Sequence, residues 1–269
     1  MAKPWCHPCI LTCCIIGLSA LTALTAGCGA IPGDPFAPQA LFLNVSDCPA
    51  GNANAESTDV VVLDWTGGGN QIYRDENFEG VDLSVFETAE GGTLADDEET
   101  FKERVRAQVA RIYCDCPDAN LIVINGEDDE PADTIVHVTQ NTQPDDGKDI
   151  GEAEYDPCNL QDDNAAIIFG ERLWQLSDTY TFDEWVYVFA NVTAHEIGHT
   201  LGYAHVARAN QPEIGRMLIT DLMLDRHTMA EMRRPQAFLT ELSYCPSDPS
   251  QKSRSVNAAS ASEDTYTVD

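Results

Sequence analysis

Residues 181–205 read TFDEWVYVFANVTAHEIGHTLGYAH, and this stretch decides the fold. Thr181 followed three residues later by Glu184 is a capping-box pattern, which marks the N-terminus of a helix. The apolar residues that follow recur at helical spacing as far as Leu201. Gly202 can then adopt the left-handed conformation that ends a helix and turns the chain. We therefore predict one long helix that begins at the cap and stops at this glycine.

The last two turns of this helix carry the side chains that point to chemistry. Residues four apart lie on one face of a helix, so His195 and His199 can aim ring nitrogens at one metal ion. A turn at Gly202 would bring His205 round as a third ligand. Three neutral imidazoles with one open position are typical of catalytic zinc, whereas structural zinc has four protein ligands. Glu196 could then take a proton from a zinc-bound water, whose pKa the metal lowers, and pass it to a leaving amine.

The chain before this helix alternates between strand and helix patterns. Runs of β-branched and apolar residues predict strands, and acidic residues followed by apolar ones at helical spacing predict a helix. We expect the helix over residues 96–112 and the strands at residues 60–63, 121–124, 134–138, 150–155 and 165–169. The order predicts a sheet with a crossover helix on it and a second helix that carries the chemistry.

The pattern His-Glu-x-x-His-x-x-Gly-x-x-His over residues 195–205 resembles the zinc motif of the metzincin clan of peptidases. The short His-Glu-x-x-His pattern is moderately specific, and the added Gly202 and His205 make the match specific. The resemblance implies that the three histidines bind zinc and that Glu196 is the general base. Metzincins also place a methionine in a tight turn beneath the metal. Met223 is the best candidate for it here, and Met217 is its rival.

The order of elements resembles the matrixin branch, the matrix-metalloprotease-like enzymes. This resemblance implies an α+β catalytic domain with a five-stranded mixed sheet, two main helices and a C-terminal subdomain that contains the methionine turn. In that branch an antiparallel edge strand binds extended peptide by strand addition, and by position residues 150–155 would be that strand. Two matrixin features are not evident. Cys48 is the only candidate for a cysteine-switch propeptide, and His137 alone is too few ligands for a second structural zinc site.

The chain is strongly acidic, which bears on the partners and ions that it can bind. The 269 residues include 45 acidic and 15 basic ones, which gives a formal net charge of −30. Such a surface repels nucleic acid, so we expect no nucleic-acid partner. Acidic loops supply the hard oxygen ligands that calcium prefers, and matrixins carry such ions, although solvated acidic loops are the alternative. The candidate calcium ligands are Asp128, Asp129, Glu130, Asp145, Asp146, Asp149, Asp156, Asp162 and Asp163.

The N-terminus is a targeting segment. Lys3 is followed by an apolar run over residues 10–26, close to the length of a signal-peptide core and short for a membrane span. The small residues before Cys28 resemble the lipobox of bacterial lipoproteins, in which the cysteine becomes the lipid-bearing N-terminus, although Thr25 stands where a leucine is usual. We expect export to the bacterial cell envelope with a lipid on Cys28, or else plain secretion.

Export makes the remaining cysteines candidates for disulfides, and a Cys48–Cys245 bond would tie the two ends of the domain together. A stretch rich in Pro, Ala and Gly predicts a tether, and a C-terminal stretch with few apolar residues predicts disorder. We expect residues 1–27 to be the signal peptide, 28–50 the tether, 51–246 the zinc peptidase domain and 247–269 a disordered tail.

The expected activity is that of a zinc endopeptidase acting on protein or peptide substrates. One alternative is a non-catalytic surface binding protein on the same fold, which would commonly lack Glu196 or a ligand. Another is a zinc hydrolase that acts on a non-peptide amide. The sequence indicates neither the cleavage specificity nor the oligomeric state.

Overall fold

The structure contains the predicted sheet, both predicted helices and the three histidines proposed as metal ligands. The structure is a computed structural model, and it describes residues 59–69, 71–74, 76–114, 121–127, 131–144, 147–156, 159, 161, 163–177, 179–205, 220–224, 226–237 and 265–268. These residues all belong to one compact unit, Ala40–Asp269. The expected signal peptide (residues 1–27), the expected tether (residues 28–50, with Cys28 and Cys48) and Cys245 lie outside the described residues.

Five strands of the central sheet follow the order β4-β1-β5-β7-β6. Four strands are parallel to one another, namely β1 (Asp59–Asp64), β4 (Leu121–Gly126), β5 (Thr134–Thr139) and β7 (Asn164–Phe169). The fifth, β6 (Gly151–Ala153), runs antiparallel to β7. Every residue of β7 is buried, which is the mark of a strand covered on both faces. The α+β class and the mostly parallel mixed sheet are therefore confirmed, as is the antiparallel direction of β6.

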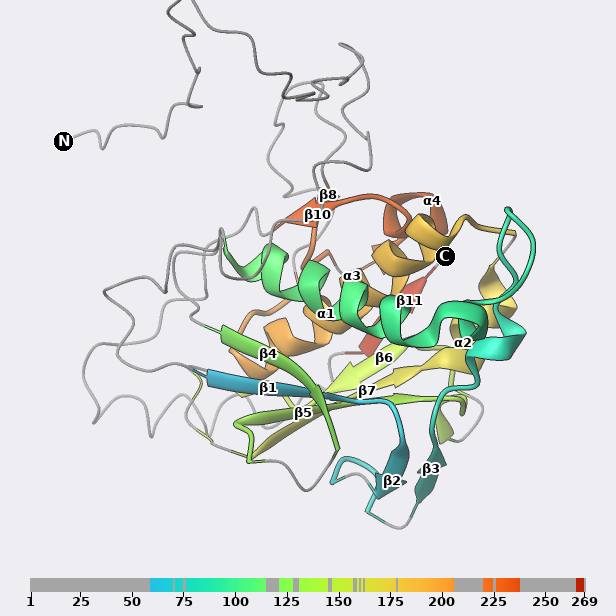
Figure 1. Ribbon diagram of the computed structural model, residues 1–269. Coiled ribbons are helices and arrows are strands. Elements are labelled where there is room, and N and C mark those ends of the chain that lie inside the picture. The colour runs from blue at the N-terminus through green and yellow to red at the C-terminus, as the bar shows by residue number, and fades with distance from the viewer. Residues whose placement is uncertain are drawn as a thin grey trace, which may run out of the picture. The chain divides into compact units, whose positions relative to one another are not determined.

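Two long helices lie on one face of this sheet (Figure 1). The helix α1 (Glu98–Cys114) follows a short 3-10 helix at Leu94–Asp97, and its acidic first turn is favoured by the helix dipole. The helix α3 (Phe182–Thr200) starts at the predicted capping box, in which the Thr181 side chain accepts from the Glu184 amide and the Glu184 carboxylate accepts in return. Both predicted helices are confirmed.

The core lies between the sheet and these two helices. Aromatic rings from separate elements meet there in edge-to-face contacts, with Phe101 and Phe189 centroids 5.3 Å apart and Phe86 and Trp185 centroids 4.9 Å apart. Tyr113 of α1 also donates its hydroxyl to the carbonyl of Ala194 on α3 at 2.6 Å. These contacts join α1 and the segment of Phe86 to α3 along much of its length.

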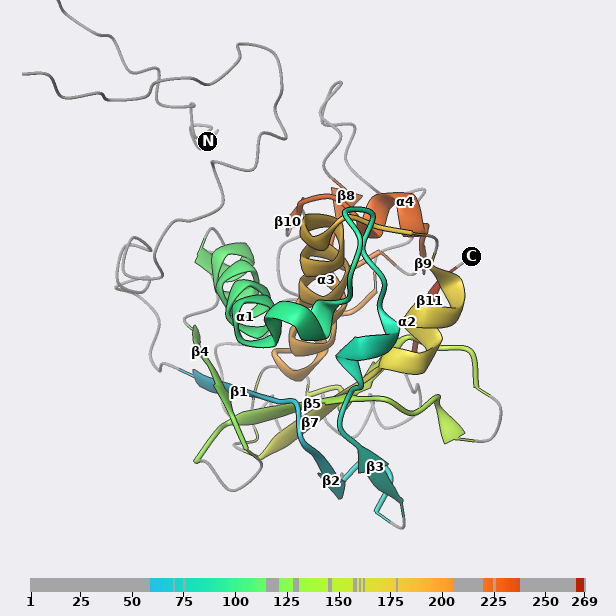
Figure 2. The same ribbon diagram turned by 45° about the vertical axis from the view of Figure 1, so that its right-hand side comes forward.

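Several short elements were not predicted. Figure 2 shows α4 and the β8-β10 pair beside α3, at the end of the molecule away from the hairpin of β2 and β3. They are too short for a periodic pattern to show. The elements are β2 (Gly67–Gly69), β3 (Asn77–Glu79), a 3-10 helix at Leu83–Val85, α2 (Gly170–Leu176), β8 (Thr220–Asp221), β9 (Arg226–His227), α4 (Met229–Met232) and β10 (Gln236–Ala237).

The C-terminal strand β11 (Thr265–Val268) departs from the sequence prediction. It pairs antiparallel with β6 and parallel with β9, so the sheet continues past β6. The disordered tail expected over residues 247–269 therefore does not hold for these four residues. Their sequence, Thr-Tyr-Thr-Val, is β-branched and aromatic, which favours a strand, but it is too short to stand out in a polar stretch.

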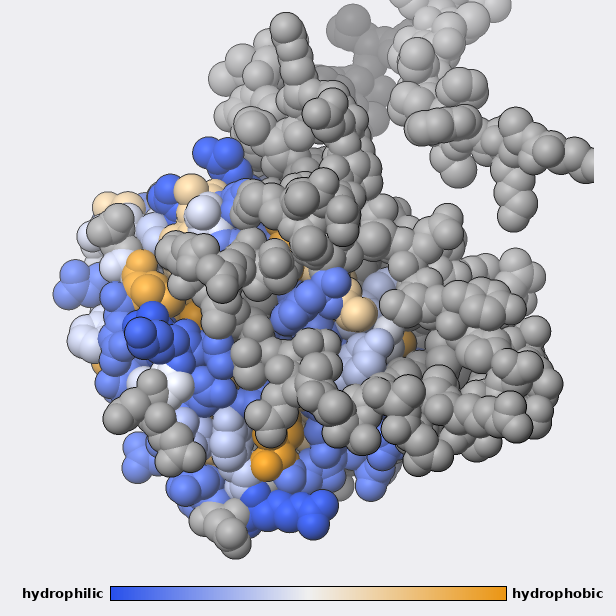
Figure 3. All heavy atoms as spheres, turned by 180° about the vertical axis from the view of Figure 1, so that it is seen from behind, coloured by the Kyte–Doolittle hydropathy of each residue, from blue (hydrophilic) through white to orange (hydrophobic). Residues whose placement is uncertain are grey.

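The surface agrees with the acidic composition. Seen from behind, the described surface is mostly hydrophilic with small apolar patches (Figure 3). Among the described helices, none combines the length and apolar character needed to cross a membrane. Cys114, the last residue of α1, forms a disulfide bond, in line with the expectation that cysteines of the domain are oxidised.

Candidate metal centre

The end of α3 places two of the three predicted ligands. His195 and His199 lie in its last two turns and are fully buried. The helix then stops at Gly202, whose φ of +90° is the left-handed conformation that glycine adopts without strain. The Gly202 amide donates to the His199 carbonyl, and the Tyr203 amide donates to the Gly198 carbonyl, both at 2.9 Å. This turn reverses the chain, as predicted, and brings the half-buried His205 back to the helix.

The three imidazoles converge on one point. The Nε2 atom of His195 lies 3.0 Å from that of His205, and the Nε2 atom of His199 lies 3.1 Å from each of the other two. Zinc binds imidazole nitrogen at about 2.0–2.1 Å in a tetrahedral arrangement, which separates ligand nitrogens by about 3.3 Å. The spacing therefore fits a zinc ion. Within the described part of the chain these histidines are the one group of side chains arranged to share a metal ion.

Backbone carbonyls fix which ring nitrogen carries the proton. The Nδ1 atom of His195 lies 2.7 Å from the carbonyl oxygen of Leu222, and that of His199 lies 2.9 Å from the carbonyl oxygen of Tyr203. Because a carbonyl oxygen can only accept, each Nδ1 must donate, and each Nε2 then presents a lone pair. Two lone pairs facing each other at 3.1 Å repel unless a cation lies between them. The hydrogen bonds thus orient both rings as metal ligands.

Burial keeps these rings neutral. It lowers the pKa of His195 well below its ordinary value, and the neighbouring His199, His205 and His227 lower it further. Burial likewise lowers the pKa of His199 to about 3, with His205 adding to the effect. Only a neutral imidazole can bind a metal, so both rings are ready to do so near neutral pH without losing a proton first.

Glu196 is fully buried on α3, next in sequence to His195. Neither of its carboxylate oxygens has a hydrogen bond to any described residue. A Cβ added at Gly151 of β6 would lie 2.5 Å from Oε1 of Glu196, so the missing side chain at that position makes room for the carboxylate. Burial raises the pKa of Glu196 well above its usual range, and Glu152 and Asp149 raise it further. A buried polar group without a partner is rare in a folded protein and fits a group that meets water, metal or substrate.

Met223, the predicted turn methionine, lies in a turn of the chain. The turn follows β8, and Met223 is fully buried in the main core cluster. Its neighbour Leu222 supplies the carbonyl that holds His195. This places the methionine directly after the residue that orients the first ligand. The rival Met217 lies outside the described residues.

Behind His195 lies a group of buried polar residues that the sequence did not predict. His227 is fully buried, its Nε2 lies 3.2 Å from the same Leu222 carbonyl, and its Nδ1 lies 3.1 Å from the amide nitrogen of Gln236. Because the Gln236 amide donates, Nδ1 of His227 accepts and Nε2 donates to Leu222. Asn191, one turn before His195, donates to the carbonyls of Met232 and Arg234 at 2.8 Å each. No local pattern marks these residues, since their partners are far away in the sequence.

The candidate calcium ligands that the structure describes and His137 are not part of the histidine centre. Most of the candidate calcium ligands lie outside the described residues. Of those described, Asp163 is exposed, and Asp149 is one of the acidic neighbours of Glu196. Asp156 is buried and accepts from the backbone amide of Gln161 and from the Asn164 side chain. His137 on β5 pairs with the buried Asp64 of β1 at 3.1 Å. Burial alone would raise the pKa of Asp64, but hydrogen bonds from His137 and Thr66 bring it below its usual value.

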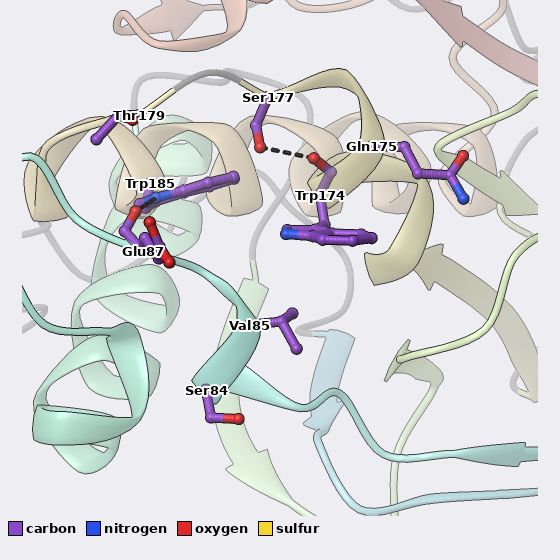
Figure 4. A pocket seen from close by; sticks show the side chains of 8 residues that line it. All are labelled: Ser84, Val85, Glu87, Trp174, Gln175, Ser177, Thr179 and Trp185. Carbon is purple, nitrogen blue, oxygen red and sulfur yellow. Dashed lines mark hydrogen bonds between the residues drawn. The ribbon is translucent and has the colours of Figure 1, made fainter.

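A separate pocket of about 770 Å³ opens near the other end of α3 (Figure 4). Trp174, Val85 and Trp185 contribute its apolar wall, and the Trp185 indole donates to the Glu87 carbonyl at 3.0 Å. Trp185 precedes His195 by ten residues, about 15 Å along a helix. None of the residues that line this pocket belongs to the histidine centre.

Comparison with profiles of known protein families and with curated proteins finds no match to this chain.

Proposed function

We propose that this chain is a zinc-dependent endopeptidase that is similar to the matrixin branch of the metzincins. The observation that carries the proposal is the meeting of three imidazole Nε2 atoms, 3.0–3.1 Å apart, beside the buried and unpartnered carboxylate of Glu196. Three neutral nitrogen ligands leave one position of a tetrahedral zinc ion open, which is the arrangement of catalytic rather than structural sites.

His195, His199 and His205 would hold the ion, and the turn with Met223 would lie behind it. Zinc held there would supply a Lewis acid that acidifies a water molecule and polarises the substrate carbonyl. Glu196 takes a proton from the attacking water and returns it to the nitrogen of the leaving amine. Its raised pKa suits this role, because a group that must both accept and return a proton works best when its pKa lies near the operating pH.

The position of β6 favours an extended peptide as the substrate. Gly151 of this strand packs against Glu196, so the strand runs directly beside the proposed general base. A peptide that pairs with a strand edge gains backbone hydrogen bonds without regard to its side chains. A substrate paired with β6 would carry its backbone carbonyls past Glu196, which suits cleavage within a chain.

The substitution Glu196→Gln tests the mechanism. It keeps the size of the side chain and removes its ability to accept a proton. We expect peptide cleavage to fall by about 10²–10⁴-fold while the protein still binds one zinc ion. Glu99→Gln, an exposed glutamate on α1, is the matched control and should leave cleavage unchanged. Full activity of Glu196→Gln with zinc bound would rule out this proton role.

A broad peptide library separates the peptidase from its alternatives. Zinc-loaded protein should cleave a subset of the library, and a chelator should abolish the cleavage. Zinc binding with no cleaved peptide would favour the non-catalytic binding protein. Hydrolysis of small non-peptide amides alone would favour the amidohydrolase.

We also propose that the chain is exported and held at the membrane through Cys28. The support is the apolar run over residues 10–26 and the small residues before the cysteine. Mass spectrometry of the mature N-terminus should find a lipid-modified Cys28. An unmodified N-terminus at a nearby residue would instead establish plain secretion.

A further inference from the structure

The outer edge of β6, beside the proposed general base, is covered by the chain's own C-terminal strand. Thr265 lies opposite Glu152 and Tyr266 opposite Gly151, in an antiparallel pair. The next two residues of β11 pair on the other side, with Thr267 opposite Arg226 and Val268 opposite His227 of β9 in a parallel pair. The first two residues of β11 thus pair with β6, and its last two pair with β9.

Both partners of β11 contact the metal centre. On one side, Gly151 packs against the carboxylate of Glu196. On the other side, the ring of His227 lies 6.2 Å from that of His195, and both rings donate to the same Leu222 carbonyl. The strand β11 therefore pairs at one end with the strand that packs against Glu196, and at the other end with the strand that carries His227.

This position is the one that an extended substrate needs. A strand edge offers one row of backbone groups, and it can pair with only one extended segment at a time. The residues Thr265–Val268 supply such a segment, with the β-branched and aromatic side chains that favour strand pairing. The C-terminal strand and a peptide paired with β6 are therefore mutually exclusive.

We propose that β11 is an internal competitive inhibitor, and that the enzyme becomes fully active only when residues 265–268 leave the edge of β6. This inference rests on the proposed peptidase function, because it assigns regulation to that same site. A segment tethered to the same chain competes at a high effective concentration, so it can hold back a weakly binding peptide without being tightly bound itself. Removal of the last residues by another protease, or displacement by a substrate that pairs better, would release the site.

A chain that ends at Asp264 tests the proposal against the full chain. Every residue of the metal centre is unchanged in this variant, so kcat should stay the same. The apparent KM should fall by roughly tenfold or more, because the fraction of molecules with a free edge rises. A synthetic peptide of residues 265–269, added to the shortened chain, should restore the inhibition in competition with the substrate.

Hydrogen–deuterium exchange supplies a readout that does not depend on catalysis. Peptides that cover Gly151–Ala153 should exchange faster in the shortened chain than in the full chain. Tyr266→Phe is the matched control, because phenylalanine keeps the size and strand preference of the residue, and it should leave both KM and exchange as in the full chain. Zinc content and melting temperature, measured on all three proteins, exclude a change in folding.

The outcomes distinguish this inference from the function on which it rests. Unchanged KM together with unchanged exchange at β6 would overturn the inhibitory role of β11 while leaving the peptidase intact. Faster exchange without cleavage by either chain would confirm the pairing and overturn the peptidase proposal, and self-inhibition with it.

Discussion

Two of the three candidate ligands are prepared by a helix, and the third depends on a turn. His195 and His199 are fully buried on α3, and each donates its Nδ1 proton to a backbone carbonyl. His205 is half-buried and follows the reversal at Gly202. The two histidines of α3 are therefore held in place by the core of the protein itself, without help from a metal ion. The position of His205 depends instead on the left-handed backbone conformation of Gly202.

The largest expected effect comes from removing one of the two histidines on the helix. His199→Gln removes a buried ligand from the fixed helix and should lower zinc affinity by more than about 100-fold. Loss of a group that only hydrogen-bonds to a ligand costs about 10–100-fold. His205→Gln should lower zinc affinity by less than His199→Gln, because the two helix-borne nitrogens stay in place. Titration against a zinc-chelating indicator measures both. If His205→Gln lowered zinc affinity as much as His199→Gln or more, the ligands on the helix would not be the better organised ones.

The next effect is a pH dependence of the metal-free protein. His199 has a pKa of about 3 in the fold and about 6.5 when unfolded. Between these values the unfolded chain binds more protons, so the free energy of unfolding should decrease as the pH falls below about 6.5, by up to about 1.4 kcal/mol per pH unit from this residue.

This pH dependence is best measured by urea unfolding in a Glu196→Gln background. The raised pKa of Glu196 acts in the opposite sense, because its stabilising contribution is present at low pH and is lost as the pH rises. Adding His199→Gln to that background should make the curve less steep between pH values of about 6.5 and 4, with His195, whose pKa is also lowered, supplying the slope that remains. An equally steep curve in the double variant would show that His199 is not held neutral by burial.

The smallest effect concerns the turn. Gly202→Ala forces a side chain into a conformation with a φ of +90°, which should lower the free energy of unfolding by about 1–2 kcal/mol. Zinc affinity should also fall, because the change shifts His205 relative to the helix. Gly69→Ala is the matched control, since a Cβ at that position meets nothing within 4 Å. If both variants unfold at the same urea concentration, the turn does not depend on glycine.

The contrast between the two helix histidines and His205 also explains what the sequence could predict. The capping box at Thr181, the spacing of the two helix histidines and the break at Gly202 are local signals, and the structure confirms each of them. The strands β1, β4, β5 and β7 follow from equally local apolar runs. These features could be predicted because the residues that determine them lie within a few positions of each other.

The remaining features depend on contacts between distant residues. The carbonyl that orients His195 belongs to Leu222, 27 positions later, and the room for Glu196 is made by Gly151 on another element. His227 and Gln236 carry no motif, and β11 pairs with a strand more than a hundred residues earlier. No periodicity in the sequence reports such pairings, so the buried polar residues behind His195 and the covered edge of β6 emerge only from the fold.

X-ray absorption spectroscopy at the zinc edge tests the central claim most directly. For the zinc-loaded protein we predict three imidazole nitrogens at about 2.0–2.1 Å and one further light ligand, with no sulfur at about 2.3 Å. His199→Gln should reduce the imidazole signal. A sulfur shell, fewer than three imidazoles, or a failure to bind zinc near neutral pH would contradict the assignment of His195, His199 and His205 as the zinc site.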